Sequence, residues 1–548
     1  MAGPVERDRA ALTRANALPR WLVPAVAALP VVVLTGLYFW PLTTLVARVV
    51  RPSSIGDALG APGLANVLWF TLWQAVFSTA LTLVIGFVPA YVLARYRFVG
   101  RRALLAIVTV PFMLPTVVVG AAFLALLPSS WHDTAGAVVI AHVFFNIAVV
   151  VRLVGAMWAV LPTDLTAAAR TLGASPAQVL RHIVLPLLRP SLWAAATVVF
   201  LFTFTSFGVV RVLGGSAHPT LEVEIVRRAT QLGDVDGAAV LSILQLLALA
   251  AVVWWSARAQ RKGTHALAGS SHWRITRSRR ERVVVFSVAS AIALAMSLPL
   301  LMMVSRSFRL GNQWTLSAWQ KLGDVEVRPG VSLGVDPVAS MLTSLRFAAV
   351  AAIVATMVGG LAALAIAAAR RRGALLDVGL MLPLGTSAVT VGLGLLITFD
   401  AAPFDWRGSW WLVPLGHALV AIPFVVRALL PILRAIPSDQ RSAAATLGAS
   451  PTRAWLAIDV RRVVRPLIAA GGLAAAISLG EFGATTILTR AGTETMPIAI
   501  ARLLGRAGEL PRAQGFALAT LLLVATAVVI VGVVGVAEKE GLFDARRH

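Results

Sequence analysis

Twelve long stretches of this chain contain almost no charged residues, and this pattern constrains the fold more than any other feature. A helix that crosses a bilayer needs about 20 apolar residues. The stretches reach or approach that length, three of them only when extended past Arg152, Arg427 or Glu481. Only 13% of the residues are charged, too few to cover the surface of a soluble protein. We therefore expect an all-α polytopic membrane protein with about twelve transmembrane helices. The stretches are 21–47, 58–94, 103–132, 134–151, 190–210, 237–257, 283–305, 347–369, 378–399, 408–426, 466–480 and 513–537.

The positive charges lie in alternate loops between these stretches. Lysine and arginine number 48 against 24 acidic residues, and they gather in 1–20, 95–102, 256–282 and 370–372. Cytoplasmic loops of membrane proteins carry an excess of lysine and arginine. The pattern predicts that both termini and these loops are cytoplasmic, and it accounts for the charge without a nucleic-acid partner. The chain has no cysteine, which excludes disulfides and thiolate metal sites.

An internal repeat divides the chain into two halves. The sequence TLGASP occurs at 171–176 and again at 446–451, an offset of 275 residues. At that offset, 142–176 and 417–451 agree at 15 of 35 positions. Six spans per half is an even number, so both halves enter the membrane in the same orientation, with a pathway between them. The predicted segments are 1–20 (cytoplasmic), 21–255 (first half), 256–282 (basic linker), 283–537 (second half) and 538–548 (cytoplasmic tail).

The repeated segment is predicted to form two short helices around a glycine, on the cytoplasmic side, at 162–186 and 437–462. We expect an aspartate to cap the first helix, alanines to give it a low-profile face, and glycine to end it. Serine then caps the second helix, with proline at its first position. Such a helix suits docking into a groove on another protein, whereas the simpler alternative is an ordinary connector. The residues concerned are Asp164, Ala168, Ala169, Gly173, Ser175 and Pro176, and Asp439, Ala443, Ala444, Gly448, Ser450 and Pro451.

This segment resembles the EAA loop of permease subunits from bacterial binding-protein-dependent ABC importers of the type I fold. That loop reads Glu-Ala-Ala, three residues, Gly, nine residues, Ile, one residue, Leu-Pro. The glutamate is replaced by Ala167 and Ser442, and the second copy has Val460 and Arg461 instead of Leu-Pro. The matching residues are Ala168, Ala169, Gly173, Ile183, Leu185 and Pro186 in the first copy and Ala443, Ala444, Gly448 and Ile458 in the second.

The resemblance covers essentially the whole chain and implies a function. A fused pair of six-span halves is similar to permeases for iron(III) and for thiamine, and 203–229, 479–488 and 495–506 resemble the thiamine branch. The implied protein lies in the bacterial cytoplasmic membrane and receives a solute from an extracytoplasmic binding protein. Two copies of a separate ABC ATPase bind ATP and magnesium, so this chain carries no cofactor. Thiamine is the favoured solute, with iron(III) or another small solute as alternatives.

The sequence lacks the motifs of an ATPase and of a zinc peptidase. It has no Gly-Lys pair, which a phosphate-binding loop needs, and no His-Glu-x-x-His motif. We therefore expect a transport subunit without catalytic residues. An ion-coupled secondary transporter is the alternative from another class, because it too can have two six-span halves. Glu481 is thin support for ion coupling, and paired docking loops have no role there. A membrane-embedded enzyme would show clustered acids and histidines.

A few polar and aromatic residues within the spans are candidates for the substrate pathway. Glu481 either attracts a cation in the pathway or serves as a structural carboxylate paired with an arginine or a helix N-terminus, and Ser206 is its equivalent. Phe207 and Phe482 adjoin glycines and either form a gate or simply pack. We interpret His142 and His417 as packing residues, since no second histidine or acid stands at helical spacing. The loop 215–236 either meets a substrate-delivering protein or is a solvated re-entrant segment.

Overall fold

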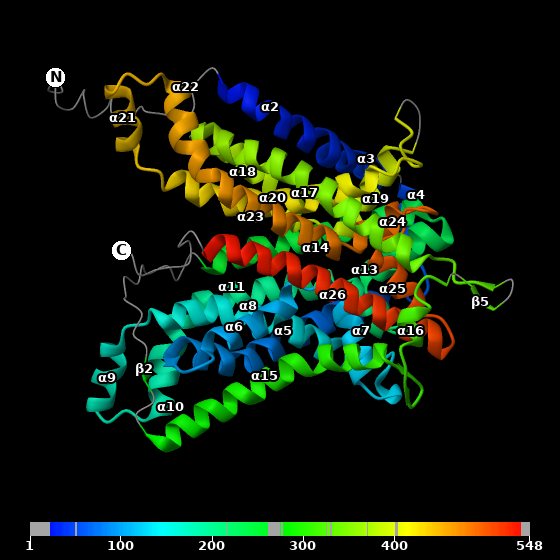
Figure 1. Cartoon of the computed structure of the whole chain (residues 1–548), viewed down its shortest axis with the longest axis horizontal. Helices are drawn as coiled ribbons and strands as arrows, with labels where there is room; N and C mark the ends of the chain where they lie inside the picture. Colours follow the sequence, from blue (N-terminus) through cyan, green and yellow to red (C-terminus); the bar gives the residue numbers. More distant parts are fainter. Residues whose placement is uncertain are drawn as a thin grey trace. The chain divides into compact units, whose positions relative to one another are not determined.

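The computed structural model describes a chain that is helical over most of its length (Figure 1). The predicted N-terminal segment 1–20, nearly all of the tail and most of the basic linker lie outside the described residues. Within the described part, the strands form three short pairs, which are β1 (Tyr96–Arg97) with β2 (Arg274–Ile275), β3 (Arg309–Leu310) with β4 (Gln313–Trp314), and β5 (Glu326–Arg328) with β6 (Val331–Ser332). The described residues are 22–49, 52–215, 217–260, 274–275, 278–324, 326–328, 331–369, 371–400 and 404–538.

The membrane spans predicted from the apolar stretches are confirmed. Ten helical segments in the described residues are long and apolar enough to cross a bilayer, and twelve if each of two bent pairs is one span. A helix suits the bilayer because all its backbone hydrogen bonds are internal. The ten are Leu22–Val49, Leu64–Arg95, Ala135–Ala159, Pro176–Phe204, Val235–Arg258, Arg279–Ser307, Pro337–Ala368, Leu412–Arg434, Thr452–Gly480 and Glu509–Val533.

The third and ninth spans are bent, which the apolar pattern does not reveal. The pair α6 (Arg101–Met113) and α7 (Thr116–Leu126) turns by 107°, and Gly373–Gly385 with α19 (Ala388–Thr398) turns by 101°. The first bend lies at Leu114, whose backbone is extended because a proline follows it. The two bends fall at corresponding places in the repeat, so the duplication extends to this detail of the fold.

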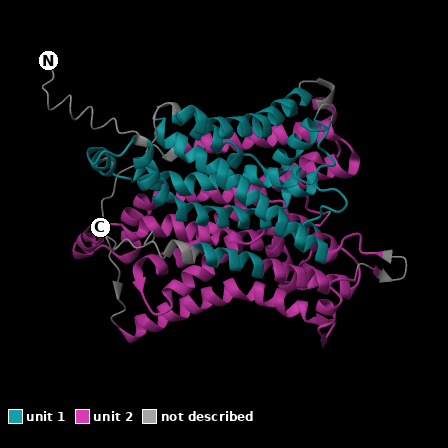
Figure 2. Cartoon of the chain, turned by 45° about the horizontal axis from the view of Figure 1, so that its top comes forward, with its two compact units in different colours: residues 1–51, 338–498, 524–548 teal, residues 52–337, 499–523 magenta. Residues whose placement is uncertain are grey.

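The chain forms two compact units that differ from the two sequence halves (Figure 2). Unit 1 comprises 1–51, 338–498 and 524–548, and unit 2 comprises 52–337 and 499–523. The first span of each sequence half therefore belongs to the unit built mainly from the other half. In unit 1, α3 (Trp40–Val49) packs against α19, and in unit 2, α15 (Arg279–Ser307) packs against α6 and α7.

Unit 2 is built around the long helices α5 (Leu64–Arg95), α8 (Ala135–Ala159) and α11 (Leu185–Phe204). A Cβ added to Gly86 of α5 would lie 2.9 Å from the Cβ of Val150 in α8, so only glycine permits this approach. The other helices of unit 2 include the span α14 (Val235–Gln260) and the short α4 (Pro52–Leu59), η2 (Ser129–Trp131), α12 (Gly208–Leu213), α13 (Leu221–Arg227), η4 (Arg228–Leu232) and α16 (Ser317–Gln320).

Unit 1 repeats this packing with the corresponding elements. A Cβ on Gly359 in α17 (Pro337–Ala368) would lie 2.8 Å from the Cβ of Val425 in α20 (Leu412–Arg434), and Val425 stands 275 residues after Val150. Helix α20 also packs along α23 (Arg461–Gly480). The other elements are α2 (Leu22–Leu34), η1 (Thr35–Phe39), α18 (Arg371–Met381), η5 (Pro383–Gly385) and α24 (Gly483–Leu488), while α25 (Met496–Leu504) and α26 (Glu509–Glu538) are divided between the units.

Candidate functional site

The two copies of the repeated segment fold in the same way. We call 162–186 docking loop 1 and 437–462 docking loop 2. Each begins with a short helix, α9 (Thr163–Thr171) or α21 (Ser438–Thr446), followed by a glycine turn and a second helix, α10 (Pro176–Val179) or α22 (Pro451–Ala454). Figure 1 places α9 and α10 at the opposite end of unit 2 from α13, and α21 and α22 at the opposite end of unit 1 from α24. The two short helices around a glycine are thus confirmed.

The second helix of each docking loop continues directly into a membrane span. Helix α10 runs through the π-helical turn η3 (Leu180–Val184) into α11, and α22 runs through η6 (Trp455–Val460) into α23. The sequence prediction begins these spans only at 190 and 466. The structure corrects that view, because each docking loop is joined to its span by one unbroken helical segment.

A left-handed glycine forms the turn in each docking loop. Gly173 has a φ of 84° and Gly448 a φ of 82°. Residues with a side chain rarely adopt this conformation, so glycine is required by the backbone. A Cβ at either position would meet no atom within 4 Å, which leaves backbone strain as the reason for the requirement.

The predicted serine caps are confirmed and the aspartate caps are wrong. The Ser175 hydroxyl accepts a hydrogen bond from the Gln178 backbone N–H, and the Gln178 side-chain oxygen accepts one from the Ser175 backbone N–H, which completes a capping box. Ser450 accepts from the Arg453 N–H at 3.3 Å. Asp164 and Asp439 instead lie inside the first turn, because the N-cap positions belong to the prolines at 162 and 437, without side-chain capping. A carboxylate there still interacts favourably with the helix dipole.

The exposed surface of the docking loops contains an apolar residue that the sequence reasoning missed. Leu172 and Leu447, each directly before the turn glycine, are both 88% exposed. Ala168 and Ala443 are also exposed, whereas the alanines at 169 and 444 are half-buried. The sequence signal that could have revealed this residue is the leucine that recurs in both copies of TLGASP. The two docking loops therefore expose a large apolar side chain at equivalent positions.

The four pathway candidates lie at equivalent helix breaks and are all buried. Ser206 and Phe207 stand between α11 and α12, and Glu481 and Phe482 stand between α23 and α24. His142 approaches Ser206, with its Nε2 2.8 Å from the hydroxyl. The structure thus places each pair in a non-helical connection between two helices, within its own unit.

Glu481 is held by donors from its own unit. Its carboxylate accepts hydrogen bonds from the N–H groups of Ala484 and Thr485 and from the Thr485 hydroxyl, at 2.8–3.0 Å. His417 lies 3.5 Å from the same carboxylate and contacts the hydroxyls of Ser478 and Thr485. This is the geometry of the structural alternative, with a helix N-terminus as partner, and a role in the pathway stays a prediction. His417 packs as expected, but the structure adds an acidic partner that is distant in sequence.

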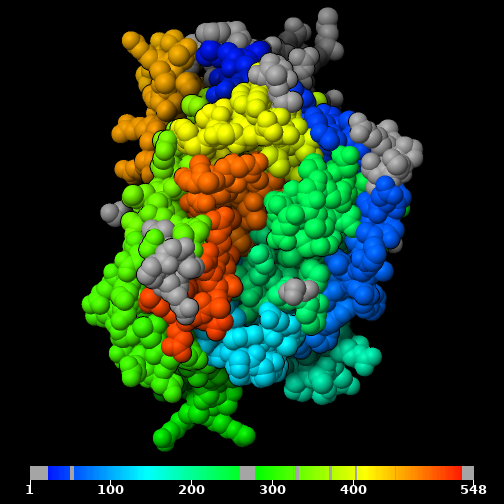
Figure 3. All heavy atoms as spheres, turned by 90° about the vertical axis from the view of Figure 1, so that its right-hand side faces the viewer, coloured from blue at the N-terminus to red at the C-terminus, as the bar shows by residue number. Residues whose placement is uncertain are grey.

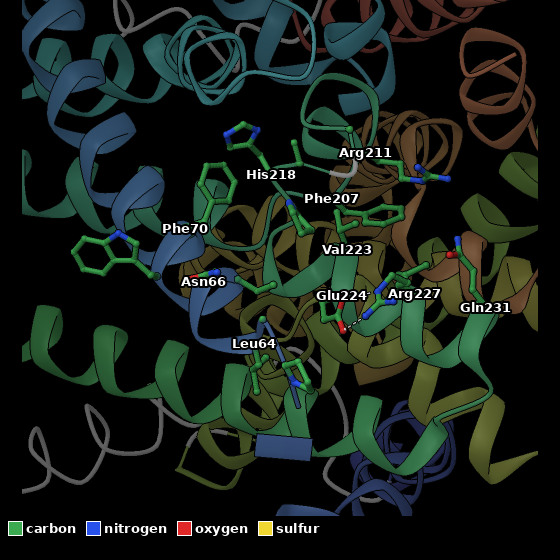
Figure 4. Close-up of a pocket in the computed structure, with 18 residues that line it drawn as sticks. Leu64, Asn66, Phe70, Phe207, Arg211, His218, Val223, Glu224, Arg227 and Gln231 are labelled. Carbon is green, nitrogen blue, oxygen red and sulfur yellow. Dashed lines mark hydrogen bonds and ion pairs between the residues drawn. The ribbon is translucent and has the colours of Figure 1, made fainter. Parts of the chain in front are cut away.

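A cavity of about 710 Å³ opens in unit 2 between the start of α5 and the helices α12 and α13 (Figure 4). We call it the α13 pocket. Phe207 is the pathway candidate that lines it, together with aromatic rings from Trp69 and Phe70 and the guanidinium groups of Arg211 and Arg227. Figure 3 shows the face where the blue segment beginning at α4 borders the green segment of α12, α13 and η4. Among the described residues, no three His, Asp or Glu side chains gather into a metal-binding group.

Two acidic residues of the predicted loop 215–236, Glu222 and Glu224, are buried, so a solvated segment is the wrong description for them, whereas Asp234 is exposed. Glu222 is 0% and Glu224 is 5% exposed. Burial would raise the pKa of the Glu224 carboxyl, but hydrogen bonds and charge from Arg227 and Arg228 outweigh it and hold the pKa below its usual value. The wall of the α13 pocket therefore presents an ion-paired carboxylate.

Comparison with known proteins gives matches across both halves. Residues 82–265 match the family described as "Binding-protein-dependent transport system inner membrane component". The chain is 27% identical to a probable ABC transporter permease protein of Sinorhizobium fredii, over 89% of this chain and 91% of that protein. It is 24% identical to the thiamine transport system permease protein of Salmonella typhimurium and 25% identical to that of Escherichia coli, over 90% of this chain and 93% of each relative.

Proposed function

Because this chain belongs to the binding-protein-dependent ABC transporter permeases, as a multi-pass inner-membrane protein with two fused halves, we propose that its docking loops bind two copies of a separate ATPase. The observation that carries this proposal is the exposure of Leu172 and Leu447 beside left-handed glycines at equivalent positions. In this arrangement the ATPase binds ATP and magnesium, and this chain needs no cofactor of its own.

The orientation follows from the charges of the loops. With arginine-rich loops inside, both termini and both docking loops face the cytoplasm. The α13 pocket then faces outward, since it lies at the other end of unit 2 from α9 and α10. A substrate-loaded binding protein meets the permease on that side.

The transport step follows from the continuity of docking loop and span. ATP-driven closure of the ATPases moves the docking loops, and each loop carries its attached span because the helix between them is unbroken. ATP binding favours one orientation of the permease only if the ATPases contact its two states with different free energies. Hydrolysis then resets the permease.

Thiamine is the solute that we propose, with iron(III) or another small solute as the alternatives. Two observations support thiamine. Relatives that align over 90% of this chain are named as thiamine transport permeases. The α13 pocket presents the aromatic rings of Trp69, Phe70 and Phe207, which can attract an organic cation through their faces.

Reconstituted transport tests the proposal. The permease is placed in liposomes with its ATPase, and thiamine delivered by its extracytoplasmic binding protein is followed inside the vesicles. We expect uptake that needs ATP, the ATPase and the binding protein together. Uptake without ATP or ATPase would contradict the ABC mechanism, and tight ferric-ion binding by the receptor would replace thiamine with iron(III).

A further inference from the structure

The two docking loops share a backbone but are held to their spans by different side chains. The π-helical turns η3 and η6 occupy equivalent positions, since Leu180 and Trp455, where they begin, are 275 residues apart. In η3 the Leu185 N–H donates to the Leu180 carbonyl five residues back. Such turns change the hydrogen-bond spacing within a continuous helix and often mark functional sites. They lie where each docking loop passes into its span, so the side chains around them decide how stiff that joint is.

Docking loop 2 has a buried ion pair across this joint. Arg441 extends from α21 and Asp459 lies in η6, 18 residues later. The Arg441 Nε donates to Oδ2 of Asp459 at 3.0 Å, and its Nη2 donates to Oδ1. The side chain of Asp459 is 0% exposed and that of Arg441 is 13% exposed. A two-pronged contact of this kind fixes orientation as well as distance, so α21 is tied directly to the start of α23.

Docking loop 1 has no such pair at these positions. Thr166 and Val184 stand where docking loop 2 has Arg441 and Asp459. The Thr166 hydroxyl donates to the Thr163 carbonyl at 2.7 Å, within its own helix, and Val184 is buried among apolar side chains. The capping box of docking loop 1 ties residue 175 to residue 178 and does not reach α9.

We propose that Arg441 and Asp459 are positioning residues that make docking loop 2 the stiffer of the two connections between ATPase and membrane helices. The proposal rests on the proposed function, since it needs an ATPase at both loops. At its other end, α23 is linked to α20 through Ser478, which contacts His417. A movement of α21 is therefore passed to α23, and from there to α20, by specific polar contacts at both ends of one helix.

A double variant tests this role with residues that the chain already uses. R441T with D459V gives docking loop 2 the side chains of docking loop 1, and it removes both charges together, because one buried charge left alone is strongly destabilising. The measurement is made on reconstituted complexes that contain both ATPase copies. The solute imported per ATP hydrolysed should fall about tenfold, within the usual range of coupling between sites.

Controls separate this role from a merely structural one. R434T removes an exposed arginine at the end of α20, outside both docking loops, and should leave the transport-to-hydrolysis ratio unchanged. R441K keeps the charge but loses the two-pronged contact, so its ratio should lie between those of the wild type and the double variant. If the double variant does not assemble, the transport-to-hydrolysis ratio of R441K tests the proposal instead.

Two results would overturn the proposal, and both differ from failure of the proposed function. The first is an unchanged transport-to-hydrolysis ratio in the double variant, or in R441K if the double variant does not assemble. The second is a parallel loss of assembly, hydrolysis and uptake in R441K, the pattern of a simple folding defect. If the ATPase does not bind the wild-type permease at all, it is the docking assignment that fails.

Discussion

Truncation of the two exposed leucines should weaken ATPase binding without destabilising the permease. Leu172 and Leu447 are each 88% exposed, so nearly all of each side chain is available for burial in a partner. L172A or L447A removes three carbons, which at about 0.8 kcal/mol per buried carbon is about 2 kcal/mol. That free energy corresponds to about 30-fold weaker binding at the altered loop. In the double variant each of two independent sites binds about 30-fold more weakly, so the overall constant for binding both ATPase copies falls about 10³-fold.

The measurement is the dissociation constant of the ATPase from permease in nanodiscs, together with the melting temperature of the permease. L375A is the matched control, because Leu375 in α18 is 81% exposed and lies outside the docking loops. We expect the control to bind normally and all variants to melt as the wild type does. Normal ATPase affinity in the double leucine variant would refute the docking surface.

Three further perturbations probe the loops, the pocket and the packing. G173D with G448D forces a side chain onto left-handed backbone, and it should abolish co-purification of the ATPase while membrane insertion is retained; unchanged co-purification would argue against the loops. E224Q should lower the melting temperature at neutral pH. Because the pKa of Glu224 is lowered, its ion pairs stabilise the fold at pH values above the ordinary glutamate pKa, and this stability is lost as the pH falls through the lowered pKa. The melting temperatures of E224Q and the wild type should therefore converge in acid. A difference in melting temperature that stays constant with pH would contradict this reasoning. G86A places a Cβ 2.9 Å from Val150 and should cost about 1–3 kcal/mol of stability, whereas G532A, with no atom within 4 Å, should be tolerated; equal melting temperatures would show that α5 and α8 can separate.

Helix caps and glycine turns could be predicted from the sequence because they depend on residues that are neighbours in the chain. The capping by Ser175 and the turn at Gly173 follow from neighbouring residues, so the repeated motif predicted both. The expected caps at Asp164 and Asp439 failed by two positions, since proline took the N-cap place. The exposure of Leu172 was not predicted, because an apolar residue in a loop is equally compatible with packing inward.

The sequence by itself determined the apolar spans, the duplication and the two docking loops, because hydropathy, identity at a fixed offset and turn chemistry are properties of short segments. The tertiary structure alone decided which spans share a unit, the contact of His417 with Glu481, the pairing of Arg441 with Asp459, and the α13 pocket. Each of these joins side chains from different helices. Whether these side chains come into contact depends on how the helices pack. An apolar helix face can pack against lipid or against many other helices, so the sequence pattern of one helix does not specify its partner.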